Sequence, residues 1–269
     1  MGWLTKIAKL GVMILAVTLS VFAHADRLDD IQQRGYLLVG TTGDYKPFSY
    51  YDGKNYSGYD IDVAKYMAKQ LNVDIRFVKT TWKGLIPDLQ QGKFDIAMGG
   101  ITRRIDRQLA AEQTQGYMTF GKLFLVQRGQ AHLYNTLAKV NNPKVRVGVN
   151  IGGTNEKFAD QYLNKATLVK FEDNLAVPKA VLAGKVDLMV TETPEALYYQ
   201  TTNPKFGVVR KNNPFTKSQF TYLIGKGEQR LLNTVNFLMD DMRLQGIDQQ
   251  MMQNNHLAIP KYILAETTS

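Results

Sequence analysis

The sequence predicts an α/β protein made of two lobes with a ligand cleft between them. Strand-like apolar runs alternate with helical patterns, which is typical of parallel sheets covered by helices. The alternation occurs twice, over residues 36–98 and again over residues 144–190. Ligands of open α/β sheets bind outside the carboxyl ends of the strands. We therefore expect one cleft to be walled by the four polar loops that follow strands, at residues 41–50, 99–107, 150–155 and 191–195.

In the first repeat, a helix is predicted at residues 27–34, because Leu28 and Ile31 lie three positions apart and Gly35 follows. A strand follows at residues 36–40. The next helix, at residues 61–71, presents one apolar face made of Ile61, Ala64, Met67, Ala68 and Leu71. The repeat is completed by a strand at 74–78, a short helix at 85–91 closed by Gly92, and an apolar run at 94–98.

The second repeat has the same order of elements. Its predicted members are a strand at 144–149, a helix at 155–163, a strand at 166–171, a helix at 174–183 and a strand at 186–190. Two further helices are predicted at 227–245 and 247–254. Strands that alternate with helices predict a parallel sheet in each lobe.

Composition limits the classes of function. The chain has 269 residues with 44% apolar content, enough for a sizeable core in one or two domains. It contains no cysteine, which excludes disulfides and thiolate chemistry. The formal charge of +9 comes from scattered lysines and arginines. This pattern favours small anionic ligands and does not indicate a nucleic-acid surface.

The first 25 residues resemble a secretory signal peptide. Lys6 and Lys9 precede an apolar run at residues 10–22, and Ala23-His24-Ala25 forms an A-x-A cleavage site. The apolar run is short for a membrane span, although a retained anchor is the alternative. We expect cleavage after Ala25, export to the periplasm and no membrane anchor in the mature protein.

The stretch TTGDYKPFSY at residues 41–50 places several aromatic residues and a carboxylate in a predicted loop. One interpretation is a turn whose aromatic residues pack on their own domain. The other is a wall of the cleft, which would bring Asp44 and Tyr45 to a ligand. The position of this loop after a strand favours the second interpretation.

Several motifs together resemble the periplasmic solute-binding proteins for polar amino acids. They are GTTGDYKPFSY, GYDIDVAKYMAKQL, WKGLIPDLQQGKFDIAMGGIT and GKVDLMVTETPEA, in that order along the chain. The resemblance implies a periplasmic binding protein-like type II fold, in which two crossovers join two lobes around the cleft. It implies a discontinuous first lobe at 26–118 plus 219–269, a second lobe at 119–218, and crossovers near 119–122 and 214–218.

A narrower resemblance concerns enzymes built on the same fold. TTGDYKPFSY, VNIGGTNEKFA and LMVTETPEA are similar to the cyclohexadienyl dehydratases. These exported enzymes convert prephenate to phenylpyruvate and arogenate to phenylalanine, and they need no cofactor. A shared fold does not establish an activity, so each residue of the site has to be considered separately.

The resemblance assigns ligand contacts in the first lobe. Arg107 would clamp a carboxylate, because a planar guanidinium can donate two parallel hydrogen bonds. The plainer interpretation is a surface helix residue, and Arg103 or Arg104 could compete for the role. The other contacts implied for this lobe are Asp44, Tyr45, Trp82, Gly100 and Thr102. Trp82 could instead be a core residue.

The resemblance assigns the second lobe both binding and catalysis. Thr154 and Asn155 stand where a helix begins, a position that favours anions but that also suits an ordinary helix cap. Glu192 corresponds to the acid that holds the α-ammonium group in amino-acid binders. Glu195 would face the ligand as a general acid, and Lys122 would neutralise carboxylates near it. The alternatives are a solvated glutamate in a first helical turn and a solvated hinge lysine.

Two functional hypotheses remain, and neither requires a metal or cofactor. Outside the first 25 residues only His132 and His256 are present, without the spacing of a metal motif. The first hypothesis is a dehydratase acting on prephenate and arogenate, with Glu195, Lys122 and Asn155 as catalytic residues. The second is a binding protein that delivers an amino acid to the permease of an ABC importer. Glu195 and Lys122 distinguish the two hypotheses.

Overall fold

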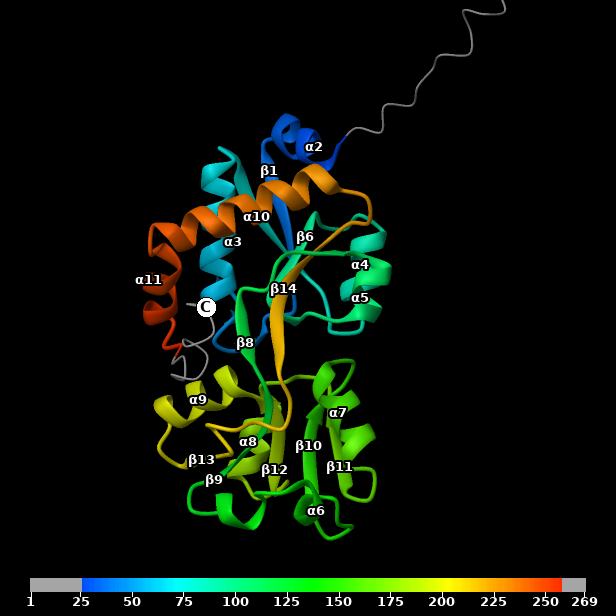
Figure 1. Cartoon of the computed structure of the whole chain (residues 1–269), viewed down its shortest axis with the longest axis vertical. Helices are drawn as coiled ribbons and strands as arrows, with labels where there is room; N and C mark the ends of the chain where they lie inside the picture. Colours follow the sequence, from blue (N-terminus) through cyan, green and yellow to red (C-terminus); the bar gives the residue numbers. More distant parts are fainter. Residues whose placement is uncertain (1–25, 258–269) are drawn as a thin grey trace, which may run out of the picture.

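The computed structural model describes residues 26–257. It contains two large sheets, one above the other in Figure 1, each covered by helices on both faces. The upper sheet has the order β5-β1-β6-β14-β7, and β8 also pairs with β14. Its strands are β1 Tyr36–Thr41, β5 Asp74–Lys79, β6 Ile96–Thr102, β7 Glu112–Gln113, β8 Met118–Phe120 and β14 Ser218–Ile224. We call this half of the molecule lobe 1.

Lobe 2 is built on a five-stranded sheet with the order β11-β10-β12-β9-β13. Its strands are β9 Lys122–Gln127, β10 Arg146–Asn150, β11 Thr167–Phe171, β12 Leu188–Glu192 and β13 Phe206–Val209. The predicted α/β class with two lobes is confirmed. The predicted signal peptide lies outside the described residues.

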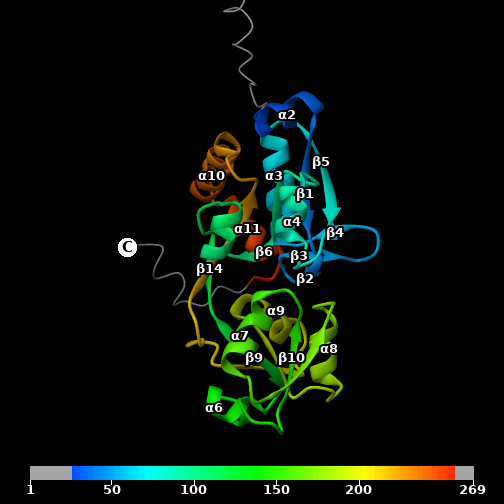
Figure 2. The same cartoon turned by 90° about the vertical axis from the view of Figure 1, so that its right-hand side faces the viewer.

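Helices cover both faces of each sheet (Figure 2). Lobe 1 carries α2 Arg27–Arg34, α3 Tyr59–Gln70, α4 Leu85–Gln90, α5 Ile105–Ala110, α10 Gln229–Leu244 and α11 Ile247–Asn254. Lobe 2 carries the 3₁₀ turn η1 Ala131–Leu133 and the helices α6 Leu137–Val140, α7 Thr154–Tyr162, α8 Ala176–Leu182 and α9 Thr193–Thr202. The helices and strands of the two predicted repeats are present, with ends shifted by a few residues. Within the described part of the chain, no helix has both the length and the apolar content to cross a membrane.

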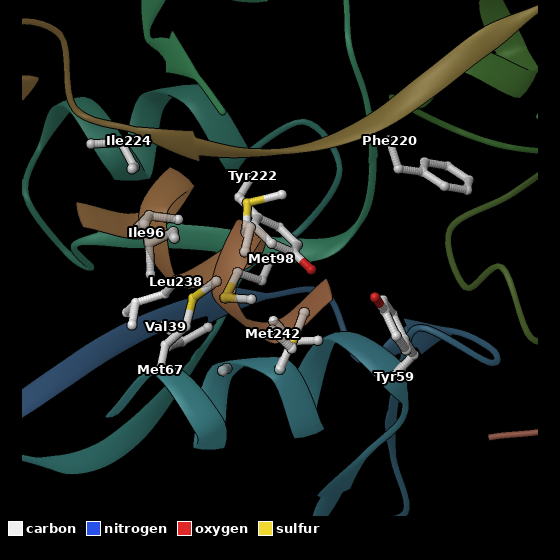
Figure 3. Close-up of a cluster of buried hydrophobic side chains, with 14 of the residues drawn as sticks. Val39, Tyr59, Met67, Ile96, Met98, Phe220, Tyr222, Ile224, Leu238 and Met242 are labelled. Atoms are coloured by element: carbon white, nitrogen blue, oxygen red, sulfur yellow. The ribbon is translucent and has the colours of Figure 1, made fainter. Parts of the chain in front are cut away.

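The larger core of lobe 1 lies between its sheet and helices α3, α10 and α11. Side chains alternate along the central strands, so that Ile96 and Met98 of β6 face this core while Ala97 faces the other side. Figure 3 shows Met67 of α3 and Met242 of α10 meeting these strand residues. The opposite face of the sheet packs against α4 in a smaller cluster. This packing fixes the strand ends from which the cleft loops start.

The sheets are mixed, which corrects the prediction of parallel sheets. Strand β1 pairs in parallel with β5 and β6, and β10 pairs in parallel with β11 and β12. Strands β14 and β9 are antiparallel to their neighbours. These are the strands next to the two chain segments that connect the lobes. The alternation of strands and helices could not reveal them, because each enters its sheet without a preceding helix.

The two connecting segments lie against each other beside Gly121. Phe120 pairs with Ser218, and the backbone amide of Phe215 donates to the carbonyl of Lys122. A Cβ atom on Gly121 would lie 2.0 Å from the carbonyl oxygen of Thr216. Only glycine therefore allows this close approach. Figure 1 shows both connections on the same side of the molecule, where they join the lobes.

The stretch TTGDYKPFSY is not a simple loop. It contains β2 Asp44–Tyr45 and most of β3 Ser49–Tyr51. Strand β3 pairs with β2 on one side and with β4 Tyr56–Ser57 on the other, in a small antiparallel sheet. The prediction of a loop was wrong because two-residue strands leave no periodic pattern. The rings of Tyr45 and Phe48 are buried and stack with their centroids 5.4 Å apart. Tyr45 and Phe48 thus pack on lobe 1, while Asp44 and Tyr45 also contact lobe 2.

Candidate functional site

A small cavity with a volume of about 10 Å³ lies between the lobes, at the ends of β6, β10 and β12. Eight of the predicted site residues line it: Tyr45, Trp82, Gly100, Thr102, Arg107, Thr154, Asn155 and Glu192. Asn150 and Gly153 also line it and were not predicted individually. The cavity is small because polar groups of the two lobes contact one another across it.

Tyr45 and Trp82 form an aromatic wall on the side of lobe 1. Their rings meet edge to face, with centroids 5.6 Å apart. The Tyr45 hydroxyl donates to Oε2 of Glu192 at 2.6 Å and so crosses from one lobe to the other. The indole Nε1–H of Trp82 donates to the carboxylate of Asp44, 3.1 Å from Oδ1. Asp44 itself lies on an adjoining outer pocket that it shares with Trp82.

Arg107 lies in α5, not in a loop, and it lines the cavity whereas Arg103 and Arg104 do not. Its Nη1 donates to the carbonyl of Thr102 at 2.7 Å, which holds the guanidinium against the cavity wall. Burial lowers the pKa of Arg107 to about 10, so the group stays protonated at neutral pH. Arg104 instead binds Asp106, and Arg103 contacts Gln219.

A buried acid, Asp60, holds the backbone at Gly100 by a hydrogen bond. The Gly100 amide donates to Oδ2 of Asp60 at 2.6 Å, and the hydroxyls of Tyr117 and Tyr222 each donate to Asp60 at 2.8 Å. Burial raises the pKa of Asp60 to about 6. Gly100 has a φ of +68°, and a Cβ there would lie 2.3 Å from the Tyr45 ring. The Gly100 amide is therefore committed to Asp60, which sequence reasoning missed.

Lys122 of β9 connects the polar side chains that lobe 2 contributes to the cavity wall. Its side chain is buried, and its Nζ donates to Thr154 Oγ1 at 2.8 Å and also contacts Asn155 Oδ1 and Glu192 Oε1. Asn155 in turn donates to Asn150 Oδ1 at 3.0 Å. Burial lowers the pKa of Lys122, and the charge of Glu192 opposes that shift. The interpretation of Lys122 as a solvated hinge residue does not fit this environment.

Thr154 and Asn155 open α7, whose N-cap is Gly153. The predicted helix start is therefore confirmed at the cavity wall. The first backbone N–H groups of this helix and the Thr154 hydroxyl are donors of the kind that bind anions. Thr154 also lies 3.4 Å from Thr102 across the cleft, measured between the two hydroxyl oxygens.

Glu195 is placed differently from the other predicted residues. It lies in the first turn of α9, is fully buried, and stands one layer behind the cavity wall. Its Oε1 accepts a hydrogen bond from Asn174 Nδ2 at 2.6 Å, and its Oε2 contacts the Thr191 hydroxyl. Burial raises its pKa well above the usual range, and the charge of Glu192 adds to the shift. The interpretation as a solvated glutamate does not fit, and direct exposure to the cavity is not observed.

Sequence reasoning could have found two of the missed residues. Asn150 is the last residue of β10 and begins one of the four polar loops. Asn174 follows β11 by three residues, so it carries the same signal of a polar residue just beyond a parallel strand. Asp60 carries no such signal, because an acid in a first helical turn is ordinary. Among residues 26–257, no group of three or more potential ligand side chains could hold a metal ion.

Two α/β lobes around a polar cavity are typical of the periplasmic binding protein type II fold. The chain belongs to the bacterial extracellular solute-binding proteins, family 3, whose model matches residues 37–255. It is 36% identical to the cyclohexadienyl dehydratase of Pseudomonas aeruginosa, with 81% of this chain and 82% of the relative covered. It is 28% identical to the L-cystine-binding protein TcyJ of Escherichia coli, with 91% and 93% covered.

The solved structures that are similar to this chain also include both an amino-acid-binding protein and a dehydratase. The ancestral amino acid-binding protein AncCDT-1, a precursor of cyclohexadienyl dehydratase, is 40% identical with a TM-score of 0.79, covering 85% of this chain and 98% of that one. An ancestral cyclohexadienyl dehydratase is 49% identical with a TM-score of 0.55, covering 86% and 96%. The relatives therefore include both enzymes and amino-acid binders.

Proposed function

We propose that this protein is a periplasmic cyclohexadienyl dehydratase, which converts prephenate to phenylpyruvate and arogenate to phenylalanine in L-phenylalanine biosynthesis. The environment of Glu195 carries the proposal. Its carboxyl group is fully buried, and burial together with Glu192 raises its pKa well above the usual range. Burial and a neighbouring carboxylate both favour the protonated form of this carboxyl, which is the form that can act as a general acid.

The reaction needs a proton because hydroxide is a poor leaving group. The bond between the ring and its carboxylate breaks and releases CO₂. The electron pair enters the ring as the bond to the 4-hydroxyl oxygen breaks, and the ring becomes aromatic. The hydroxyl takes the proton of Glu195 and leaves as water. Glu195 regains a proton from solvent before the next turnover. A positioned general acid typically accelerates such a step by about 10²–10⁴-fold.

The remaining groups suit a substrate with two carboxylates. Arg107 lies on the lobe 1 side, while Lys122, Thr154 and Asn155 offer donors on the lobe 2 side. Trp82 and Tyr45 supply an aromatic wall for the ring, and the acid of Glu192 suits the α-ammonium group of arogenate. The reaction requires that the bound substrate opens a path to Glu195, which does not line the cavity in this structure.

The alternative is an amino-acid-binding protein that serves an ABC permease. One observation favours it: Glu192 lies on the cavity wall, opposite Arg107, and the pair could hold the ammonium and carboxylate groups of an amino acid. This alternative gives no role to a buried, protonated Glu195. Export to the periplasm is common to both functions and is in keeping with an extracellular family.

Incubation of the purified mature protein with prephenate tests the proposal. Phenylpyruvate is measured by its absorbance in alkali, with the folded Glu195→Gln variant as control. We expect turnover that depends on Glu195. A folded wild-type protein that produces no phenylpyruvate but binds an amino acid would establish the alternative.

A further inference from the structure

One residue of lobe 2, Asn174, contacts both the opposite lobe and the proposed acid. Asn174 is fully buried and lies just before α8. Its backbone amide donates to Oδ2 of Asp44 at 3.2 Å, and its Nδ2 lies 3.3 Å from the Asp44 carbonyl oxygen. The same Nδ2 donates to Oε1 of Glu195 at 2.6 Å. Asp44 belongs to β2, so these bonds cross from lobe 2 to lobe 1.

We propose that Asn174 is a positioning residue that couples closure of the two lobes to the placement of Glu195. The inference rests on the proposed function, since it assigns Glu195 the role of acid. The other hydrogen-bond partner of Glu195, Thr191, lies in lobe 2 and accompanies it however the lobes move. The bonds between Asn174 and Asp44 form only when the lobes meet. Closure therefore fixes the Asn174 amide, and that amide fixes Glu195.

The amide group suits this task because it can pair with either protonation state of the acid. Its N–H donates to the carboxylate, and its oxygen can accept from the carboxylic acid after rotation of the side chain. Among the described residues, Asn174 Oδ1 is buried without a hydrogen-bond partner. Rotation toward a protonated Glu195 would satisfy that oxygen, but in the observed orientation the amide donates and therefore favours the carboxylate.

Asn174 also acts on the acidity of Glu195. Its hydrogen bond lowers the pKa of Glu195, against the larger effects of burial and of Glu192. Loss of the Asn174 amide should therefore move that pKa further up. The titratable groups that act electrostatically on Glu195 or respond to it are Glu192 and Tyr199 on its own strand–helix segment, Asp44 and Tyr45 on β2, and Lys122 on β9.

The test compares Asn174→Ala with the wild type in two measurements. The first is kcat and KM for prephenate across pH. We expect kcat to fall by about 10²-fold with little change in KM, because a misplacement of about 1 Å has that effect. We also expect the alkaline limb of the profile to move to higher pH. Asn236→Ala is the matched control, since Asn236 holds the backbone of Gln115 far from Glu195.

The second measurement does not depend on activity. Carbon NMR of labelled glutamate carboxyls follows the titration of Glu195, whose signal is assigned by its loss in Glu195→Gln. We expect its midpoint to move to higher pH in Asn174→Ala. If the wild type shows no turnover but the midpoint still differs between the wild type and Asn174→Ala, the proposed function is refuted and the positioning of Glu195 by Asn174 stands. An unchanged kcat, or an unmoved alkaline limb and midpoint, refutes the positioning role. Asn174→Ser replaces Asn174→Ala if the latter does not fold.

Coupling to closure is tested by a double-mutant cycle with Asp44→Ala, which removes the carboxylate that accepts from the Asn174 backbone amide. If Asn174 acts through this contact, its removal should lower kcat less in the Asp44→Ala background than in the wild type. Multiplicative effects of the two substitutions on kcat would show that Asn174 acts on Glu195 independently of the opposite lobe.

Discussion

Each lobe contains a fully buried carboxyl close to the cleft: Asp60 in lobe 1 and Glu195 in lobe 2. Both have a pKa raised by burial. Asp60 accepts hydrogen bonds from one backbone amide and two tyrosine hydroxyls, and its pKa reaches only about 6. Glu195 has two neutral partners and a second carboxylate, Glu192, nearby, whose charge adds to the rise in pKa that burial causes.

The difference teaches that neighbours, and not burial alone, decide what a buried acid does. Three donors favour the ionised form of Asp60, which then holds the backbone of Gly100 in place. A like charge next to Glu195 disfavours its ionised form and keeps a proton available. We therefore assign a structural role to Asp60 and propose a chemical one for Glu195. The following predictions test this contrast, beginning with the largest expected effect.

Glu195→Gln should lower prephenate turnover by about 10²–10⁴-fold, because it keeps the shape of the side chain but removes the transferable proton. Binding of the substrate should persist or become tighter, since a group that can be negatively charged becomes neutral. Wild-type activity should fall as pH rises through the pKa of the acid, and this limb should vanish in the variant. The measurement is the pH profile of kcat with prephenate.

Glu228→Gln is a suitable control for Glu195→Gln. Glu228 pairs with Arg27 in lobe 1 and should leave turnover unchanged. Turnover close to wild type in Glu195→Gln would remove Glu195 as the acid. Glu192, which lies directly on the cavity wall, would then be the carboxyl to replace next.

Arg107→Ala should weaken ligand binding by about 2–5 kcal/mol without unfolding the protein, because one partner of a desolvated charge pair is lost. Arg107 is held at the cavity wall by the Thr102 carbonyl and belongs to neither hydrophobic cluster of lobe 1. Calorimetric binding of prephenate and thermal melting should be measured together. If the affinity is unchanged, Arg103 or Arg104 provides the clamp.

Asp60→Asn should change how stability depends on pH. The native pKa of Asp60, about 6, lies above its ordinary value of 3.8, so the native state holds this proton more tightly than the unfolded state. The resulting stabilisation is complete below about pH 4 and is lost as pH rises through about 6. Wild type should thus lose about 3 kcal/mol of unfolding free energy relative to Asp60→Asn between these limits. Denaturant unfolding at several pH values measures the difference, and parallel profiles would contradict the assignment.

The sequence predicted the cleft well because the cleft follows from strand ends. Thr154 follows β10 by four residues and Glu192 is the last residue of β12, so the sheet brings them together whatever their partners are. Their pairing could not be predicted in the same way. Contacts such as Tyr45 with Glu192 depend on how one lobe meets the other, and no local pattern encodes that arrangement.

The layer behind the cavity wall was the least predictable part of the site. Asp60 begins α3, where an acid is ordinary, and its tyrosine partners lie more than fifty residues away in the sequence. Glu195 was predicted to face the ligand, but the first turn of α9 directs it toward Asn174 and Thr191. The hydrophobic period identifies which face of a helix is buried, and it does not identify the polar groups that a buried acid will meet.

The smallest effect is expected from an ion pair that joins the lobes in solvent. Lys157 of α7 lies 3.0 Å from Asp106 of α5, and about half of each side chain is exposed. Hydrogen bonding to Arg104 is the main reason that the pKa of Asp106 is lowered, but water screens the charges of exposed groups. Asp106→Asn should therefore change prephenate affinity by less than about 1 kcal/mol, and high salt should remove the difference. Titration calorimetry at low and high salt measures it. A larger loss that persists at high salt would mean that closure depends on this exposed pair as much as on the buried contacts of Asp44 and Glu192.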